Sequence, residues 1–315
     1  MKMCLVIGGA GFIGRQVTRL LCESGRDVVV LGRRPTADRD LAPASRYISG
    51  DYSDRVVLRD LLERGCEVID LAYSTVPKTS YDDPVFDLVS NLPASVGLFQ
   101  EAINASVRRV VVVSSGGTVY GPTLDVPIRE DHATMPVSPY GITKLTIDRY
   151  AMMFHHTAGL PVVVVRPANA YGEDQRAGTG QGFIATAIAA VLAGREIEIY
   201  GASGAIRDYI HVADVAAGIV AALDHGEDGE IYNIGTQVGT SNVAIIKMIE
   251  SLAEEQAIPV RMKVLPHRRF DVEANVLDSS KLRIKSGWQA AVPLVEGLQR
   301  IWRSRWEKMP AASNR

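Results

Sequence analysis

Five short apolar runs, rich in β-branched residues, constrain the fold of this chain more than any other feature. They are CLVI at 4–7, DVVVL at 27–31, EVIDL at 67–71, RVVVVS at 109–114 and PVVVVR at 161–166. Longer segments with helical periodicity separate these runs. Continuous apolar strands that alternate with helices are typical of a parallel sheet covered by helices on both faces. The sequence therefore predicts an α/β fold with a doubly wound parallel sheet.

The pattern changes from about residue 172. A glycine-rich loop at 172–182 precedes a predicted helix at 183–193 and a short strand, EIEIY, at 196–200, and further helices are predicted near 213–224 and 241–256. We expect this part to form a smaller mixed α/β lobe on the carboxyl ends of the sheet. The predicted division is 1–171, then 172–308 with some strands returning to the sheet, then a tail at 309–315.

Composition narrows the classes of partner. The chain has 315 residues, and its formal net charge of −2 provides no bulk field for nucleic acid or anionic lipid. The apolar start, about five residues before the glycines, is too short for a signal segment or a membrane span. Three cysteines without a C-x-x-C pair, and six histidines without ligand spacing, indicate neither disulfides nor a metal site. We therefore expect a cytoplasmic protein with no membrane, nucleic-acid or metal partner.

A glycine turn, GGAGFIG at 8–14, lies between the first predicted strand and an amphipathic helix. Because Gly8 and Gly11 carry no Cβ, the backbone can turn tightly and approach a pyrophosphate at the helix N-terminus. Gly14 would let the helix pack closely on the strand. This context predicts a dinucleotide site of the Rossmann type.

The end of the second predicted strand bears on the choice of cofactor. An NAD site usually has an acid about 20 residues after the glycines, whereas a nearby arginine suits the 2′-phosphate of NADP. Here Gly32 stands at that place and Arg33 follows. Arg33 is either a phosphate ligand or a solvated surface charge. Asp51, in SGDYSD at 49–54, either accepts from the adenine amino group or belongs to a helix N-terminus.

Tyr140 and Lys144 lie four residues apart in SPYGITK, and so on one face of a helix. A neighbouring ammonium favours the phenolate, so we expect Lys144 to lower the pKa of Tyr140 towards neutral pH. Tyr140 could then act as a general acid or base. Three hydroxyl side chains near the end of the fourth strand are candidates to bind the same substrate oxygen: Ser114, Ser115 and Thr118.

These motifs occur in a specific order. With GGAGFIG, SSGGTVYG, SPYGITK, RPANAYG and RDYIHVADVA, the chain resembles the extended short-chain dehydrogenase/reductase family over residues 3 to about 302. It is most similar to the nucleotide-sugar epimerases and dehydratases of the UDP-galactose 4-epimerase type. Two departures concern the cofactor site: the acid after the second strand is missing, and Tyr73 stands where similar proteins have a small residue.

The resemblance implies a role for particular residues. Tyr140 would be the catalytic acid/base, Lys144 its partner and a ribose ligand, Ser115 the catalytic hydroxyl and Thr118 the reserve. The cofactor-binding residues would be Gly8, Gly11, Phe12, Ile13, Gly14, Arg33, Asp51, Tyr52, Leu71, Ala72, Tyr73, Ser114, Tyr140, Lys144 and Pro167. Asn169 would contact the nucleotide diphosphate of the substrate, and Arg207 and Arg268 would clamp it.

Three functions remain open from the sequence. The resemblance favours an NAD(P)-dependent nucleotide-sugar 4-epimerase of the UDP-glucose/galactose type, which oxidises C4, lets the 4-keto sugar rotate and returns the hydride. An NADPH-dependent 4-ketoreductase of a nucleotide-activated sugar is the alternative, because Arg33 favours NADP. A non-catalytic dinucleotide sensor is a third. A dehydratase is disfavoured, because Gly117 and Thr118 stand where similar dehydratases have Asp and Glu.

A homodimer through helices 139–158 and 85–105 is also expected.

Overall fold

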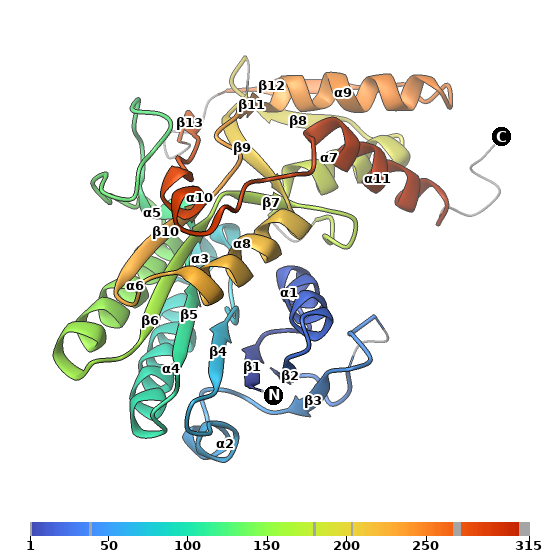
Figure 1. The fold of residues 1–315 in the computed structure, drawn as a ribbon. Helices are drawn as coiled ribbons and strands as arrows, with labels where there is room; N and C mark the ends of the chain where they lie inside the picture. Colours follow the sequence, from blue (N-terminus) through green and yellow to red (C-terminus); the bar gives the residue numbers. More distant parts are fainter. Residues whose placement is uncertain (1, 38–39, 179–180, 203, 267–271, 309–315) are drawn as a thin grey trace.

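The computed structural model describes residues 2–37, 40–178, 181–202, 204–266 and 272–308. Its centre is a seven-stranded parallel sheet with the strand order β10-β6-β5-β4-β1-β2-β3 (Figure 1). The strands are β1 (Met3–Ile7), β2 (Asp27–Gly32), β3 (Arg46–Ser49), β4 (Glu67–Asp70), β5 (Arg109–Val113), β6 (Val162–Pro167) and β10 (Glu230–Ile234). The five predicted apolar runs form β1, β2, β4, β5 and β6, which confirms the predicted fold class.

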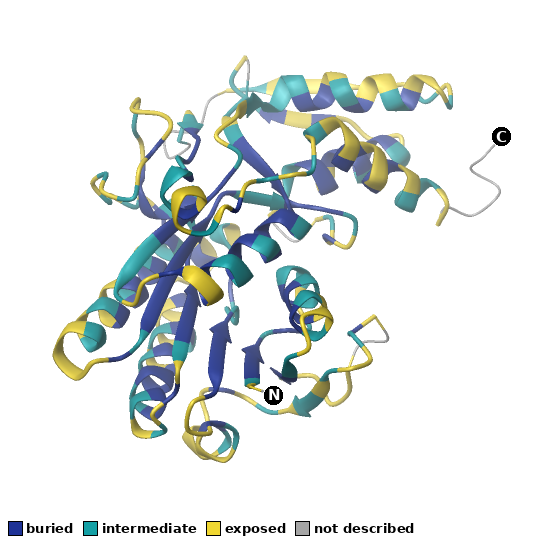
Figure 2. Cartoon of the chain, viewed as in Figure 1, coloured by how far each residue is buried: buried dark blue, intermediate teal, exposed yellow. Residues whose placement is uncertain are grey.

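Helices cover both faces of this sheet because its strands are apolar on both sides. In β1, Cys4 and Val6 enter the core with α1 (Phe12–Glu23), α8 (Val212–His225) and α10 (Ser280–Ser286). Leu5 and Ile7 alternate to the opposite core, with α2 (Arg55–Leu61), α4 (Pro84–Asn104) and α6 (Pro139–Ala158). Figure 2 shows the central strands buried along most of their length, whereas the edge strand β3 is partly exposed. Each fully buried apolar side chain contributes about 1.5–3 kcal/mol to this packing.

The second lobe is smaller and mixed. Its four-stranded sheet contains β7 (Asn169–Tyr171), β9 (Ile206–His211), β11 (Gly239–Ser241) and β13 (Ala274–Asn275), while β8 (Ile197–Tyr200) pairs with β12 (Met262–Leu265). Helices α7 (Phe183–Leu192), α9 (Asn242–Glu254) and α11 (Leu294–Trp306) pack around a third apolar core. The predicted helices at 183–193, 213–224 and 241–256 correspond to α7, α8 and α9.

The chain passes between the two lobes more than once. Strand β10 pairs with β6 in the large sheet, and α8 packs on α1, although both elements follow residue 172. The division at residue 172 therefore stays a prediction for the folding units, and the predicted tail, 309–315, lies outside the described residues. Within the described segments, no helix is long and apolar enough to cross a membrane.

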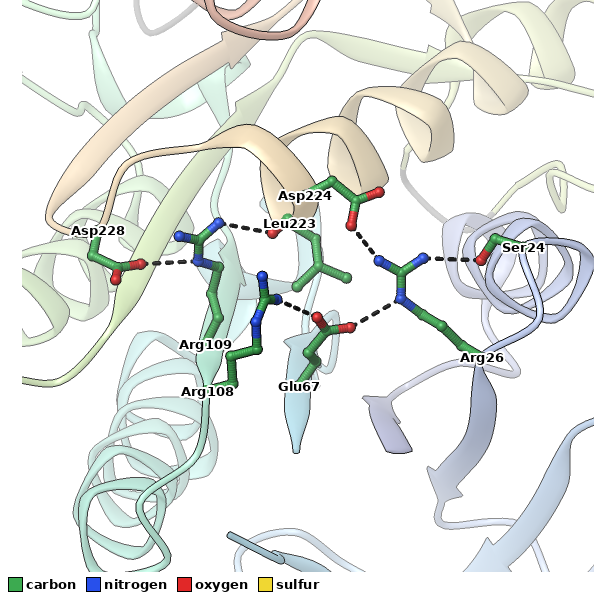
Figure 3. A network of polar contacts seen from close by, with 8 residues as sticks. All are labelled: Ser24, Arg26, Glu67, Arg108, Arg109, Leu223, Asp224 and Asp228. Carbon is green, nitrogen blue, oxygen red and sulfur yellow. Dashed lines mark hydrogen bonds and ion pairs between the residues drawn. The ribbon is translucent and has the colours of Figure 1, made fainter. Parts of the chain in front are cut away.

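Charged side chains form a network at the amino edge of the large sheet (Figure 3). Glu67, the first residue of β4, is 1% exposed and accepts from Arg26 Nε at 2.9 Å and from Arg108. Arg26 also pairs with Asp224 of α8. These contacts tie the starts of three strands to the end of a helix, at the edge opposite the cavities described next.

Candidate active site at the carboxyl edge of the sheet

Two cavities, of about 530 Å³ and about 1090 Å³, lie along the carboxyl edge of the large sheet. The smaller one extends under the second lobe, and the larger one extends past the ends of β2 and β3 towards α4. Gly8, Gly11, Leu71 and Tyr73 line both. The cavities therefore meet at the glycine turn and form one groove.

The glycine turn has the geometry expected of a phosphate cradle. Gly8 has a φ of +77°, and a Cβ there would lie 3.0 Å from Ala72 N. A Cβ at Gly14 would lie 2.3 Å from the carbonyl oxygen of Gly8, so this helix position must remain glycine for α1 to pack on the turn. Gly11 is the N-cap of α1. Phe12 and Ile13 line the smaller cavity beside it. The residues present therefore fit a bound pyrophosphate.

The larger cavity is lined by several of the predicted cofactor-binding residues: Arg33, Asp51, Tyr52, Leu71, Ala72 and Tyr73. Asp51 accepts a hydrogen bond from Ser53 N at 2.9 Å. The N-cap of α2 is Asp54, which accepts from Val56 N. Asp51 is therefore not the N-cap of this helix, and it lines the larger cavity.

Tyr140 and Ser115 meet in the smaller cavity. Ser138 caps α6 and accepts from Gly141 N, which places Tyr140 in the first turn, and Tyr140 N donates to Ser80 Oγ at 3.1 Å. The Ser115 side chain lies beside that of Tyr140 and acts to lower its pKa, against the larger effect of burial. Ser114 instead lies beside the buried Asp148, and Thr118 Oγ1 has no hydrogen-bond partner among the described residues. Of the three candidate hydroxyls, Ser115 therefore has the geometry to act with Tyr140, and its catalytic role stays a prediction.

Lys144 does not adopt the expected position. Its Nζ donates to the carbonyl of Val113 at 2.8 Å and lies 4.2 Å from the ring centre of Tyr73, against 6.0 Å for the ring of Tyr140. Tyr73 itself packs edge-on against Tyr140, with 4.8 Å between ring centres. Tyr73, which departs from the family pattern, is thus the ring that the Lys144 ammonium contacts more closely.

The predicted lowering of the Tyr140 pKa is therefore wrong for this arrangement. Burial, and then the carboxylate of Asp87, raise the pKa of Tyr140 above its usual value, and Ser115 only partly offsets them. Tyr140 and Lys144 lie one helical turn apart on α6, as the spacing predicts. The Lys144 ammonium nevertheless contacts the carbonyl of Val113 and the ring of Tyr73 instead of the Tyr140 phenol. Lys144 must move for the expected coupling to occur.

Buried charge at this edge is poorly compensated. Burial lowers the pKa of Lys144 to about 8, against support from Asp70, Asp148 and Asp87. Burial also raises the pKa of Asp70, the last residue of β4, to about 6. The Asp70 carboxylate accepts from Ala72 N at 3.1 Å, and the charge of Lys144 acts on it from nearby. Such shifted groups in a cleft are typical of functional sites.

Asp87 is a residue that the sequence analysis missed. It is fully buried in α4, accepts from the Thr75 hydroxyl, and lies 3.4 Å from the Tyr73 hydroxyl through Oδ1. Its Oδ2 has no partner among the described residues. The first turn of α4 places the exposed apolar side chains of Val85 and Phe86 next to the buried Asp87, so the sequence carries no signal that this carboxylate points inward.

The second lobe supplies the far wall of the smaller cavity. Asn169, Arg207, Tyr200 and Tyr209 line the cavity on this side, and Pro167 lines it from the end of β6. The roles predicted for Pro167 at the cofactor and for Asn169 and Arg207 at the substrate stay predictions. Arg268, the other predicted clamp residue, lies outside the described residues. Within the described part of the chain, no group of three or more His, Cys, Asp or Glu side chains is arranged to hold a metal.

Comparisons with known proteins agree with this geometry. A UDP-glucose 4-epimerase from Mycolicibacterium smegmatis is 34% identical over 301 residues, which span 93% of this chain and 95% of that protein. A UDP-glucose 4-epimerase structure from Thermotoga maritima, with UDP-glucose, has a TM-score of 0.88 at 31% identity and covers 97% of this chain and 99% of its own. The Thermus thermophilus UDP-glucose 4-epimerase in complex with NAD has a TM-score of 0.88 at 28% identity, covering 98% and 100%.

Residues 4–235 match the family described as NAD dependent epimerase/dehydratase. This match covers most of the chain, including the glycine turn, Tyr140 and Lys144. Both the match and the similar proteins above point to an enzyme with a nicotinamide dinucleotide. The chain belongs to the NAD dependent epimerase/dehydratase family.

Proposed function

We propose that the protein is a nucleotide-sugar 4-epimerase acting on a UDP-hexose of the glucose/galactose type. The observation that carries the proposal is the Tyr140–Ser115 pair, which faces a cavity bounded by the glycine turn on one side and by Asn169 and Arg207 on the other. Proton-transfer groups between a dinucleotide cradle and a sugar-nucleotide wall suit oxidation and reduction at one sugar carbon. The similar UDP-glucose 4-epimerases support this choice of substrate.

A nicotinamide dinucleotide held at the glycine turn would supply reversible hydride transfer at C4 of the sugar, first to oxidise it and then to reduce the rotated 4-keto sugar from its other face. Tyr140 removes the proton from the C4 hydroxyl and later gives it back, and Ser115 orients the same oxygen. Since the pKa of Tyr140 is raised in this structure, the proposal requires the Lys144 ammonium to leave the Tyr73 ring and approach Tyr140. Arg207 anchors the diphosphate, so that the hexose can turn while its far end is held.

The test is to incubate the purified protein with UDP-galactose and follow UDP-glucose by chromatography. We expect both sugars to reach the same final ratio from either direction, with no net change in the dinucleotide. A protein that binds UDP-galactose and a dinucleotide but leaves the sugar unchanged at C4 would contradict the proposal.

An NADPH-dependent 4-ketoreductase is the second candidate, because Gly32 and Arg33 stand where an NAD site has an acid. The same Tyr140 and Ser115 would protonate the new C4 hydroxyl. Such an enzyme would consume one NADPH for each nucleotide-activated 4-keto sugar, which absorbance at 340 nm follows. Turnover in either assay would also exclude the third hypothesis, a non-catalytic dinucleotide sensor.

We further propose a cytoplasmic homodimer that needs no metal ion. Its contact would form through α4 and α6, which pack together and expose apolar side chains: Val85, Phe86, Leu88 and Val89 on α4, and Ile142, Tyr150 and Met153 on α6. Light scattering after size exclusion would give the mass, and a monomer at micromolar concentration would contradict the proposed dimer. Loss of activity on dialysis against EDTA would contradict metal independence.

A further inference from the structure

We propose that the adenosine end of the groove is built for a ribose 2′-phosphate, so that the protein binds NADP(H) in preference to NAD(H). The inference rests on the proposed function only in requiring a bound nicotinamide dinucleotide, and it holds for an epimerase or a reductase. The glycine turn does not discriminate between the cofactors, because both carry the same pyrophosphate. The choice must be made where β2 ends, at the opposite side of the larger cavity.

In this structure the end of β2 has no room for a carboxylate unless Tyr47 shifts. A Cβ at Gly32 would lie 2.8 Å from the hydroxyl of Tyr47 and 3.1 Å from its Cε2. Moving Tyr47 aside would break the hydrogen bond that its hydroxyl donates to the carbonyl of Arg34 at 2.9 Å. Tyr47, which is paired beside Val30 on the neighbouring strand β3, thus fills the space of the acid found in NAD sites.

Positive charge replaces the acid on this wall. The exposed side chain of Arg33 follows Gly32 directly, and Arg33, Arg34 and Tyr47 all line the larger cavity. Burial and then the charge of Asp70 raise the pKa of Tyr52, which lines the same cavity, and the positive charge of Arg33 acts in the opposite direction. Within the described parts of the chain, no carboxylate forms an ion pair with Arg33. A guanidinium can bind a phosphate through two charge-assisted hydrogen bonds.

Two other charged residues that line this cavity, Arg55 and Asp51, have hydrogen-bond partners other than Arg33. Arg55 also lines the cavity, but its Nε donates to Glu101 at 2.8 Å. Asp51 is the acid among the lining residues, and its Oδ1 already accepts from Ser53 N. Because Arg33 is exposed, the attraction of a phosphate to it must weaken with added salt. An NAD-type hydrogen bond to uncharged hydroxyls would change much less with salt.

The experiment measures binding rather than turnover. The full-length protein is freed of nucleotide and titrated calorimetrically with NADP⁺, NAD⁺, 2′,5′-ADP and 5′-AMP, at low and at high salt. We expect NADP⁺ to bind at least about tenfold more tightly than NAD⁺, the effect of one charge-assisted hydrogen bond. We also expect 2′,5′-ADP to bind more tightly than 5′-AMP, and both preferences to fall at high salt.

Three variants test which residues set the preference for NADP⁺ over NAD⁺. Arg33→Ala should remove it, leaving the affinity for NAD⁺ within about twofold. Arg46→Ala is the matched control: it removes an equally exposed charge from β3, where Arg46 pairs with Asp27 outside the cavity lining, and should preserve the preference. In the double variant Gly32→Asp/Tyr47→Ala, which makes room for the acid, NAD⁺ should bind better than NADP⁺.

The outcomes separate this inference from the proposed function. Binding of NAD⁺ equal to or tighter than that of NADP⁺ would overturn the 2′-phosphate site and leave the epimerase proposal standing. A preference for NADP⁺ that persists in Arg33→Ala would overturn the assignment to Arg33. Failure of the folded protein to bind any dinucleotide would overturn both.

Discussion

Strand β4 carries a buried acid at each end, and the two carboxylates have different hydrogen-bond and ion-pair partners. Glu67, at its start, contacts two guanidinium groups, Arg26 and Arg108. Asp70, three positions along at its end, accepts one backbone hydrogen bond and interacts with the charge of Lys144, but forms no ion pair among the described residues. The first arrangement compensates buried charge and stabilises the sheet. The second leaves charge only partly compensated, which is what proton transfer at a functional edge requires.

Replacing Tyr140 by Phe should give the largest effect at the carboxyl edge. Phe keeps the ring against Tyr73 but removes the hydroxyl that Ser115 contacts. We expect turnover of the nucleotide sugar to fall by about 10²–10⁴-fold while dinucleotide affinity is retained. Steady-state rates and calorimetric titration of the same preparation measure both. Wild-type activity in this variant would mean that another group transfers the proton.

Removal of Glu67 should give the largest effect at the amino edge. Glu67→Ala leaves Arg26 and Arg108 without their shared carboxylate, so we expect the free energy of unfolding to fall by about 3–5 kcal/mol. Urea unfolding measures this loss. Asp131→Ala, which breaks the exposed pair with Arg129, is the control and should cost no more than about 1 kcal/mol. Equal losses in the two variants would show that the amino-edge network is no stronger than a surface pair.

Asp70→Asn should change the pH dependence more than the fold. Asp70 gives the largest support to the charge on Lys144, so its loss should lower the pKa of Lys144 below about 8. The alkaline limb of kcat/KM should then move to lower pH, because the ammonium is lost earlier. An unmoved alkaline limb would mean that Lys144 does not control it.

The stability of wild type gives a second readout of Asp70. The pKa of Asp70 is raised to about 6 in the folded protein, against about 4 in the unfolded chain. The protonated carboxyl therefore favours the folded state, and this contribution to the free energy of unfolding is complete below about pH 4 and is lost as the pH rises through about 6. Asp70→Asn should remove that loss between pH 4 and 6. Unfolding midpoints measured across this range compare the two proteins.

Changes at Tyr73 should have the smallest effect. The ring supports the Lys144 charge by a cation–π contact, so Tyr73→Leu should move the same alkaline limb down by about half a pH unit. Tyr73→Phe retains the ring and should leave the limb in place. A shift in Tyr73→Phe as large as that in Tyr73→Leu would assign the effect to the hydroxyl and its neighbour Asp87 instead.

The sequence by itself determined five strands of the large sheet, the glycine turn and the spacing that puts Tyr140 and Lys144 on one face of a helix. These depend on local patterns: continuous apolar runs, glycines where a Cβ would clash, and a spacing of one helical turn. The amino acids at these positions leave few alternative conformations, so the patterns can be read without knowing what packs against them.

Only the tertiary structure decided which partners those residues have. It brought β10 back to the sheet, placed Ser115 rather than Ser114 against Tyr140, turned Asp87 inward and gave the Lys144 ammonium to Val113 and Tyr73. It also placed Tyr47 against Gly32, which explains the missing acid. Each of these contacts joins residues far apart in the chain, or depends on the direction in which a side chain points. Burial and competition among several partners set them, and a one-dimensional spacing contains neither.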